Sequence, residues 1–154
     1  MPREQWDALV SGESRPLCAA IASQQTSDDY GYTVADLSVG RLRLSANQSI
    51  PGYCVFISRI HVREPYELTR EQRAAFFEEL MQVGQALERA FQAVKLNFEI
   101  LGNAVPHLHC HIKPRYYGDP APGYIINPDD HLLLLTDAEY QERVAAIRRE
   151  LDLT

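Results

Sequence analysis

The segment from His107 to Ile112 restricts the fold of this 154-residue chain more than any other. It reads His-Leu-His-Cys-His-Ile, so imidazoles and apolar side chains alternate without interruption. Successive side chains of a β-strand point to opposite faces of the sheet. The alternation therefore predicts a strand with Leu108, Cys110 and Ile112 directed into a core and three histidines directed to the other face. Neighbouring histidines would lie roughly 7 Å apart along such a strand.

Three interpretations of this histidine face are open on the residues alone. The imidazoles could be structural groups that hydrogen-bond in place. They could bind a metal, because two histidines separated by one residue on a strand can ligate zinc, although three in a line suit a single ion poorly. They could also act on phosphorus, since imidazole titrates near neutral pH and can attack a phosphoryl group and leave again.

Two capping boxes mark where helices begin. Thr69 and Gln72 precede an apolar stripe of helical period that continues to Phe91, which predicts one long helix. Thr136 and Glu139 predict a shorter C-terminal helix in the same way.

Period-two patterns predict two pairs of strands. Residues 39–46 and 53–58 would form a hairpin, with turn residues between them. Residues 95–101 and 107–113 would form a second pair, joined by the short link 102–106. Short links between neighbouring strands favour antiparallel pairing.

The order of these elements predicts an α+β fold, with an antiparallel meander sheet, one long helix and a C-terminal helix. We expect a single domain in three parts. Residues 1–38 would be an N-terminal extension that packs on the domain, with one turn of helix around Trp6 and a loop over 23–32. Residues 39–116 would form the core, and residues 117–154 a proline-rich loop followed by the last helix.

The composition limits the partners and the location. With 15 Lys and Arg against 21 Asp and Glu, the net charge of −6 argues against coating a nucleic-acid polymer or an anionic membrane, but it leaves room for one small phosphorylated substrate. Three widely spaced cysteines argue against a disulfide framework. Residues 132–135 form the strongest apolar run, which is far shorter than the roughly 20 residues that cross a bilayer. The N-terminus has no apolar signal region, and we expect a cytoplasmic protein.

Two motifs carry a resemblance to a known family. Gly102 to Arg115, with the sequence GNAVPHLHCHIKPR, resembles the signature of the histidine triad (HIT) superfamily, in which three histidines alternate with apolar residues. The segment Ile50 to Val62 is similar to the proline-glycine hairpin strand of that family, which ends in His-Val, and a Leu-Thr helix start follows it. The resemblance covers residues 39–116, about half of the chain.

The resemblance implies a HIT-like fold, a homodimer and a nucleotide hydrolase or transferase. Members cleave a nucleoside monophosphate from a leaving group through a nucleotidyl-histidine intermediate, and dinucleoside polyphosphates or adenylated amines are the substrate classes to expect. By this resemblance His109 is the nucleophile and His111 contacts the phosphate and assists the leaving group. His107 orients the nucleophilic ring, and His61 lies beside the triad. The scheme requires no metal or other cofactor.

Several further residues bear on how a substrate could be held, and most of them have two interpretations. Asn103 stands where relatives often carry glutamine and could donate its amide to a phosphate, or it is a turn residue. Ala104 replaces the Ser or Thr of many relatives, so a hydroxyl contact is missing. Asn47 lies near the residue that binds ribose hydroxyls in relatives, or it too is a turn residue. Lys113 and Arg115 could attract phosphates or form an exposed basic pair.

The predicted sheet would leave part of its surface uncovered. A small sheet with one long helix leaves an edge strand and an apolar face, which we expect a second copy of the chain to cover. The competing functions are a nucleotide-binding regulatory dimer with little turnover and a histidine-based metal-binding module.

Overall fold

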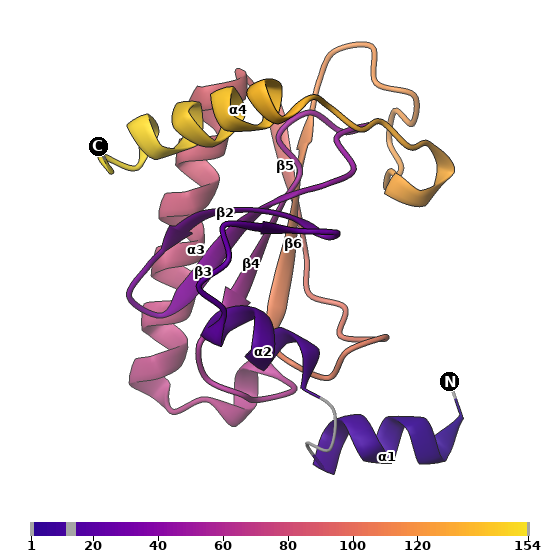
Figure 1. Ribbon diagram of the computed structural model, residues 1–154, viewed down its shortest axis with the longest axis vertical. Helices are drawn as coiled ribbons and strands as arrows, with labels where there is room; N and C mark the ends of the chain where they lie inside the picture. The colour runs from indigo at the N-terminus through magenta and orange to yellow at the C-terminus, as the bar shows by residue number, and fades with distance from the viewer. Residues whose placement is uncertain (1, 12–14, 154) are drawn as a thin grey trace.

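The computed structural model describes residues 2–11 and 15–153 and has a six-stranded antiparallel sheet at its centre (Figure 1). Along the sheet the strands follow the order β1-β2-β3-β4-β6-β5. Their bounds are β1 Ser27–Asp28, β2 Gly31–Asp36, β3 Gly40–Ser45, β4 Cys54–Ser58, β5 Lys95–Glu99 and β6 His109–Arg115. The predicted α+β class and the antiparallel pairing are confirmed.

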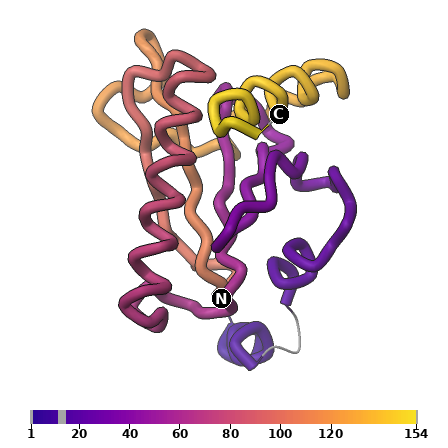
Figure 2. The backbone as a smooth tube through the Cα atoms, turned by 90° about the vertical axis from the view of Figure 1, so that its left-hand side faces the viewer, coloured from indigo at the N-terminus to yellow at the C-terminus, as the bar shows by residue number. Residues whose placement is uncertain are grey.

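Helices cover both faces of this sheet. Figure 2 shows the long helix on one side of the sheet and the short second helix on the other. The α-helices are α1 Arg3–Ser11, α2 Pro16–Ala22, α3 Arg70–Phe91 and α4 Asp137–Glu150, and two 3₁₀ turns, η1 Pro65–Glu67 and η2 Pro128–Asp130, lie in the connections. Among the described residues, no helix is long and apolar enough to cross a membrane.

The α3 face of the sheet holds the core. Phe56 on β4 packs against Phe76 on α3 with ring centroids 5.2 Å apart, and both side chains are fully buried. Cys110 and Ile112 of β6 belong to the same cluster and have no exposed surface. Both predicted capping boxes are present, and the Thr69 hydroxyl accepts the Gln72 amide at the start of α3.

The strand order departs from a consecutive meander at one place. After β4 the chain runs through α3 and returns as β5 at the outer edge, and β6 then turns back into the gap between β4 and β5. The reason is burial: the apolar side chains of β6 need neighbours on both sides, whereas β5 leaves Phe98 39% exposed at the edge. The histidine strand is therefore an inner strand of the sheet.

The N-terminal region contains more regular structure than the sequence indicated. The predicted helical turn around Trp6 is part of α1, but α2 and strands β1 and β2 were not predicted. The loop predicted over 23–32 is wrong in part, because residues 27–28 and 31–32 pair with each other. These strands lack a clear apolar alternation, and β2 is held in the sheet by its pairing with β3.

Candidate active site

Strand β6 places the histidines on the sheet face opposite α3. His111 pairs with Val55 of β4, and His109 pairs with Ile57. His107 lies just before the strand, where it is 2% exposed. The predicted division of faces holds, because Leu108 is buried in the core while His109 and His111 line a pocket on the other side.

The ring of His109 is fixed by the backbone. Its Nδ1 lies 2.5 Å from the carbonyl oxygen of His107. A carbonyl can only accept, so Nδ1 carries the proton and Nε2 keeps its lone pair. Nε2 has no hydrogen-bond partner among residues 2–11 and 15–153, and burial lowers the pKa of His109. These are the properties of a neutral imidazole prepared for nucleophilic attack.

His107 links the strand to a second histidine and to a thiol. Its Nε2 donates to the Ser58 carbonyl over 2.8 Å, which leaves Nδ1 as an acceptor. That Nδ1 lies 3.0 Å from Nδ1 of His61 and 3.5 Å from Sγ of Cys18, and the thiol is 3.3 Å from His61. The three ligand atoms all lie within 4.8 Å of one another, so these residues could hold a metal ion.

His111 has a side-chain partner instead of a backbone one. The Tyr53 hydroxyl lies 2.7 Å from its Nδ1. Burial is the main cause that lowers the pKa of His111 to about 4, and the charges of His109 and Lys113 act in the same direction. His111 is therefore neutral at physiological pH in the absence of ligand.

A pocket of about 630 Å³ extends from these histidines across the sheet. Val55 and Ile57 form its floor, and Leu17 and Ala20 of α2 form the opposite wall. The end of the pocket away from the histidines is polar and is lined by Asp28, Tyr30, Arg43 and Ser45. An apolar slot with polar groups at both ends, one of them imidazole, is suited to a flat base with a phosphate attached.

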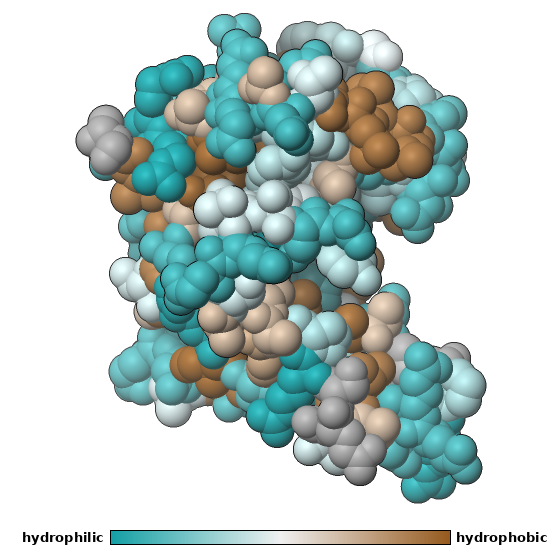
Figure 3. Space-filling model, in the orientation of Figure 1, coloured by the Kyte–Doolittle hydropathy of each residue, from teal (hydrophilic) through white to brown (hydrophobic). Residues whose placement is uncertain are grey.

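The surface of the molecule is hollowed beside its N-terminal helices. Figure 3 shows a hollow on the right of the view, between an apolar patch above and the N-terminal helices below. The patch lies where the chain leads into α4, and Leu132, Leu133 and Leu134 are 73%, 47% and 61% exposed there.

The structure brings neither of the two predicted asparagines, Asn47 and Asn103, to the lining of the pocket. The Asn47 amide donates to the carbonyls of Pro128 and His131, and its oxygen accepts two backbone amides, so this side chain anchors the loop before α4. Asn103 is exposed in the link between β5 and β6, and Val105 is the residue of that link that lines the pocket.

Tyr53 and Ser45 line the pocket but were missed at the sequence level. A signal was available for Tyr53, because it precedes Val55 and Ile57 at period two and therefore shares their face. Nothing in the sequence placed α2 over the histidines.

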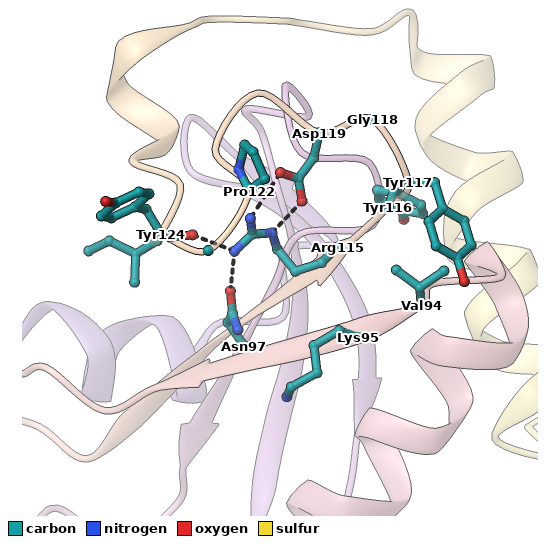
Figure 4. Close-up of a pocket in the computed structure, with 12 residues that line it drawn as sticks. Val94, Lys95, Asn97, Arg115, Tyr116, Tyr117, Gly118, Asp119, Pro122 and Tyr124 are labelled. Carbon is teal, nitrogen blue, oxygen red and sulfur yellow. Dashed lines mark hydrogen bonds and ion pairs between the residues drawn. The ribbon is translucent and has the colours of Figure 1, made fainter.

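The two basic residues that follow the triad are held by internal partners. Lys113 pairs with Glu99 over 2.7 Å and is 5% exposed. Arg115 lines a second pocket, shown in Figure 4, where it forms an ion pair with Asp119 and hydrogen bonds with Asn97 and two loop carbonyls. The interpretation as an exposed basic pair is wrong. Lys113 also donates to the Ile126 carbonyl over 3.2 Å, so both side chains hold the loop after β6.

Comparison with known proteins agrees with this architecture. The family model for the HIT domain matches residues 35–118. Among solved structures, a histidine triad protein from Bradyrhizobium japonicum is 28% identical with a TM-score of 0.73, covering 79% of this chain and 91% of that one. A histidine triad protein from Sinorhizobium meliloti is 25% identical with the same TM-score, covering 82% and 97%.

A curated relative, Protein hit of Bacillus subtilis, is 31% identical over 78 residues, which is 47% of this chain. The chain spans about half (54%) of the length of that relative. With the family model covering more than half of its residues, the chain belongs to the HIT domain family.

The low pKa of His111 predicts a pH dependence of stability. The unfolded chain takes up this proton near the ordinary pKa of 6.5, whereas the folded chain takes it up only near 4. Acidification from pH 7 to pH 4 therefore favours the unfolded state, by up to about 3 kcal/mol from this group. We expect His111→Gln to lose correspondingly less stability over this range, as measured by urea unfolding at several pH values. His131→Gln, at an exposed histidine, should keep the wild-type pH dependence, and parallel curves for His111→Gln and wild type would contradict the prediction.

Proposed function

We propose that this protein is a nucleotidyl hydrolase or transferase that acts through a covalent intermediate on His109. The observation that carries the proposal is the ring of His109, which is anchored at Nδ1, unpartnered at Nε2 among the described residues and located in the wall of a pocket large enough for a nucleotide. Family membership supports a function in nucleotide binding or hydrolysis. The substrate classes that we propose are dinucleoside polyphosphates and nucleoside phosphoramidates.

The reaction divides into two displacements at phosphorus. In the first, the lone pair on His109 Nε2 forms a bond to phosphorus, and the leaving group departs with the electrons of the bond that breaks and gains a proton. In the second, water or another acceptor forms the new bond to phosphorus and loses a proton, and the nitrogen–phosphorus bond breaks. No step needs a metal, because phosphoryl transfer depends chiefly on positioning and on stabilisation of charge.

The neighbouring residues have separate roles in this scheme. His107 supplies the carbonyl that orients the nucleophile, and its own ring is held by Ser58 and His61. His111 contacts the phosphate and assists the leaving group. Asn103 remains a proposed contact to the phosphate or the leaving-group oxygen. A ribose contact from Asn47 would require it to release the loop it anchors, and Ser45 in the pocket wall is the alternative.

Replacement of the nucleophile is the direct test. We expect His109→Asn to lower kcat by at least about 1,000-fold on adenosine phosphoramidate or diadenosine polyphosphate, because the covalent route is lost. Rapid acid quench of the wild type followed by peptide mass spectrometry should find the nucleotidyl group on His109. His131→Asn is the matched control and should retain full activity.

The same experiment separates the enzyme from the regulatory alternative. If the wild type binds nucleotide but turns over no member of a substrate panel, the protein is a nucleotide-binding module. If it hydrolyses substrates and His109→Asn is as active as the wild type, the nucleophile is assigned wrongly.

We also propose that the chain forms a homodimer through the β5 edge. Four large apolar side chains near this edge are exposed by 39% to 54% in the single chain, namely Met81, Val94, Phe98 and Leu101. An unpaired edge strand beside exposed apolar residues is a natural site for a second copy.

The proposal of a cytoplasmic location rests on a separate feature, the three cysteines, which are all free.

A charge placed on this surface should break the dimer. We expect light scattering after size exclusion to give twice the chain mass for the wild type and the chain mass for Phe98→Glu, because burial of an unpaired carboxylate is unfavourable. Tyr66→Glu changes a residue that is 74% exposed on η1 and should remain dimeric. A wild type that is monomeric at all concentrations would refute the proposal.

A second candidate function is that of a structural metal site, which Cys18, His61 and His107 would form. Thiolate and imidazole are preferred zinc ligands, and separations of 3.0 to 3.5 Å between the three donor atoms suit ligands that share one ion. His107 also donates its other ring nitrogen to the Ser58 carbonyl, which is the outer contact that metal-binding histidines usually make. When bound, zinc would supply a cross-link between α2 and the sheet.

Metal content tests this second candidate independently of catalysis. We expect about one zinc per chain after dialysis of the wild type, and loss of most of it together with a lower melting temperature in Cys18→Ser. His131→Gln should keep the wild-type metal content. Equal metal content in Cys18→Ser and wild type, or none in either after expression with added zinc, would exclude the site.

A further inference from the structure

Tyr53 makes a buried hydrogen bond to the last histidine of the triad. It lies just before β4, and its hydroxyl is 2.7 Å from Nδ1 of His111. Val55 pairs with His111 across the β4–β6 ladder, so Tyr53, two residues before Val55, is the diagonal neighbour of that histidine on the pocket face. Tyr53 is only 7% exposed and lines the same pocket as His109 and His111.

The direction of this hydrogen bond follows from the partners that are present. Within residues 2–11 and 15–153, the Tyr53 hydroxyl has no acceptor other than His111 Nδ1. A buried O–H without an acceptor is unfavourable, whereas an oxygen lone pair without a donor is tolerated more readily. Burial also raises the pKa of Tyr53, so the phenol keeps its proton. The hydroxyl therefore donates, and Nδ1 of His111 bears the lone pair.

This assignment makes the two pocket histidines opposite tautomers. His109 meets a carbonyl, which forces its proton onto Nδ1 and leaves Nε2 bare. His111 meets a hydroxyl that donates, so its proton is on Nε2. The two rings are adjacent, with centroids 5.0 Å apart and planes inclined at 74°. A phosphoryl group between them would meet a nucleophilic lone pair from one ring and an N–H donor from the other.

We propose that Tyr53 is a positioning residue that holds His111 in the Nε2–H tautomer, so that this ring donates a hydrogen bond to the phosphoryl group attacked by His109. The proposal rests on the proposed function for its catalytic consequence, but the tautomer itself is a property of the resting protein. It assigns a role to a residue outside the triad.

Neighbouring groups hold the phenol in place. The backbone nitrogen of Tyr53 donates to Ile50, and its carbonyl accepts from Ser45 and from the Gln48 side chain, so the main chain is fixed on three sides. The Lys113 ammonium lies 5.8 Å from the centre of the ring, within range of a cation–π contact. Lys113 is in turn fixed by Glu99, with both side chains largely buried.

The tautomer can be measured directly in the resting protein. In protein labelled with ¹⁵N-histidine, we expect His111, assigned by its absence in His111→Gln, to show a protonated Nε2 and an unprotonated Nδ1 near neutral pH. In Tyr53→Phe the two nitrogens should move toward averaged shifts, because the donor that fixed the tautomer is gone. Tyr32→Phe is the matched control, since it removes a phenol that bonds Asp137 on the other side of the sheet, and it should leave the His111 signals unchanged.

Kinetics then test the catalytic consequence. We expect Tyr53→Phe to lower kcat by about 10-fold with KM within about 2-fold of wild type, because the misplaced donor matters most in the transition state. Tyr32→Phe should keep the wild-type kcat.

A His111 proton on Nδ1 in the wild type would overturn the proposal. So would a Tyr53→Phe variant with wild-type histidine signals, or one with altered signals and wild-type kcat. Failure of the proposed hydrolysis would appear separately, as absence of turnover in the wild type with the tautomer still as stated.

Discussion

The two-sided character of β6 is the constraint on which the rest of the structure depends. One face of this inner strand contributes Cys110 and Ile112 to the core under α3, and the other face holds His109 and His111 against the pocket. A slip of one residue in register would exchange the two sets and place imidazoles in the core. Packing on the α3 side therefore fixes the strand, and with it the backbone that carries His109 and His111.

Hydrogen bonds to groups of the scaffold then set the tautomer of each triad histidine. The carbonyl of His107, the carbonyl of Ser58 and the hydroxyl of Tyr53 each hold one ring nitrogen. Burial lowers the pKa of all three triad imidazoles, which favours the neutral form at each position. A neutral imidazole keeps its lone pair, so Nε2 of His109 is available for attack on phosphorus without prior loss of a proton.

Helix α2 completes the site from a distance in sequence. Helix α2 forms one wall of the pocket through Leu17 and Ala20, and it brings Cys18 to His61 and His107. Asn47, the hydrogen bond from Lys113 to the Ile126 carbonyl and the Arg115–Asp119 ion pair hold the long loop that follows β6. Asn47, expected near the ribose, and Lys113 and Arg115, considered for phosphate, are thus used for loop anchoring, because a long loop needs internal partners for its carbonyls.

The sequence by itself determined the α+β class, the hairpin of β3 and β4, the two capped helices, and the face of β6 on which the histidines lie. These features depend on local periodicity and capping, which are readable from neighbours along the chain. Only the tertiary structure decided that β6 lies between β4 and β5, that α2 covers the pocket, and that Tyr53 and Cys18 contact the triad histidines. Those contacts join residues 58 and 89 positions apart, and their formation depends on how whole elements pack, for which the chain carries no local pattern.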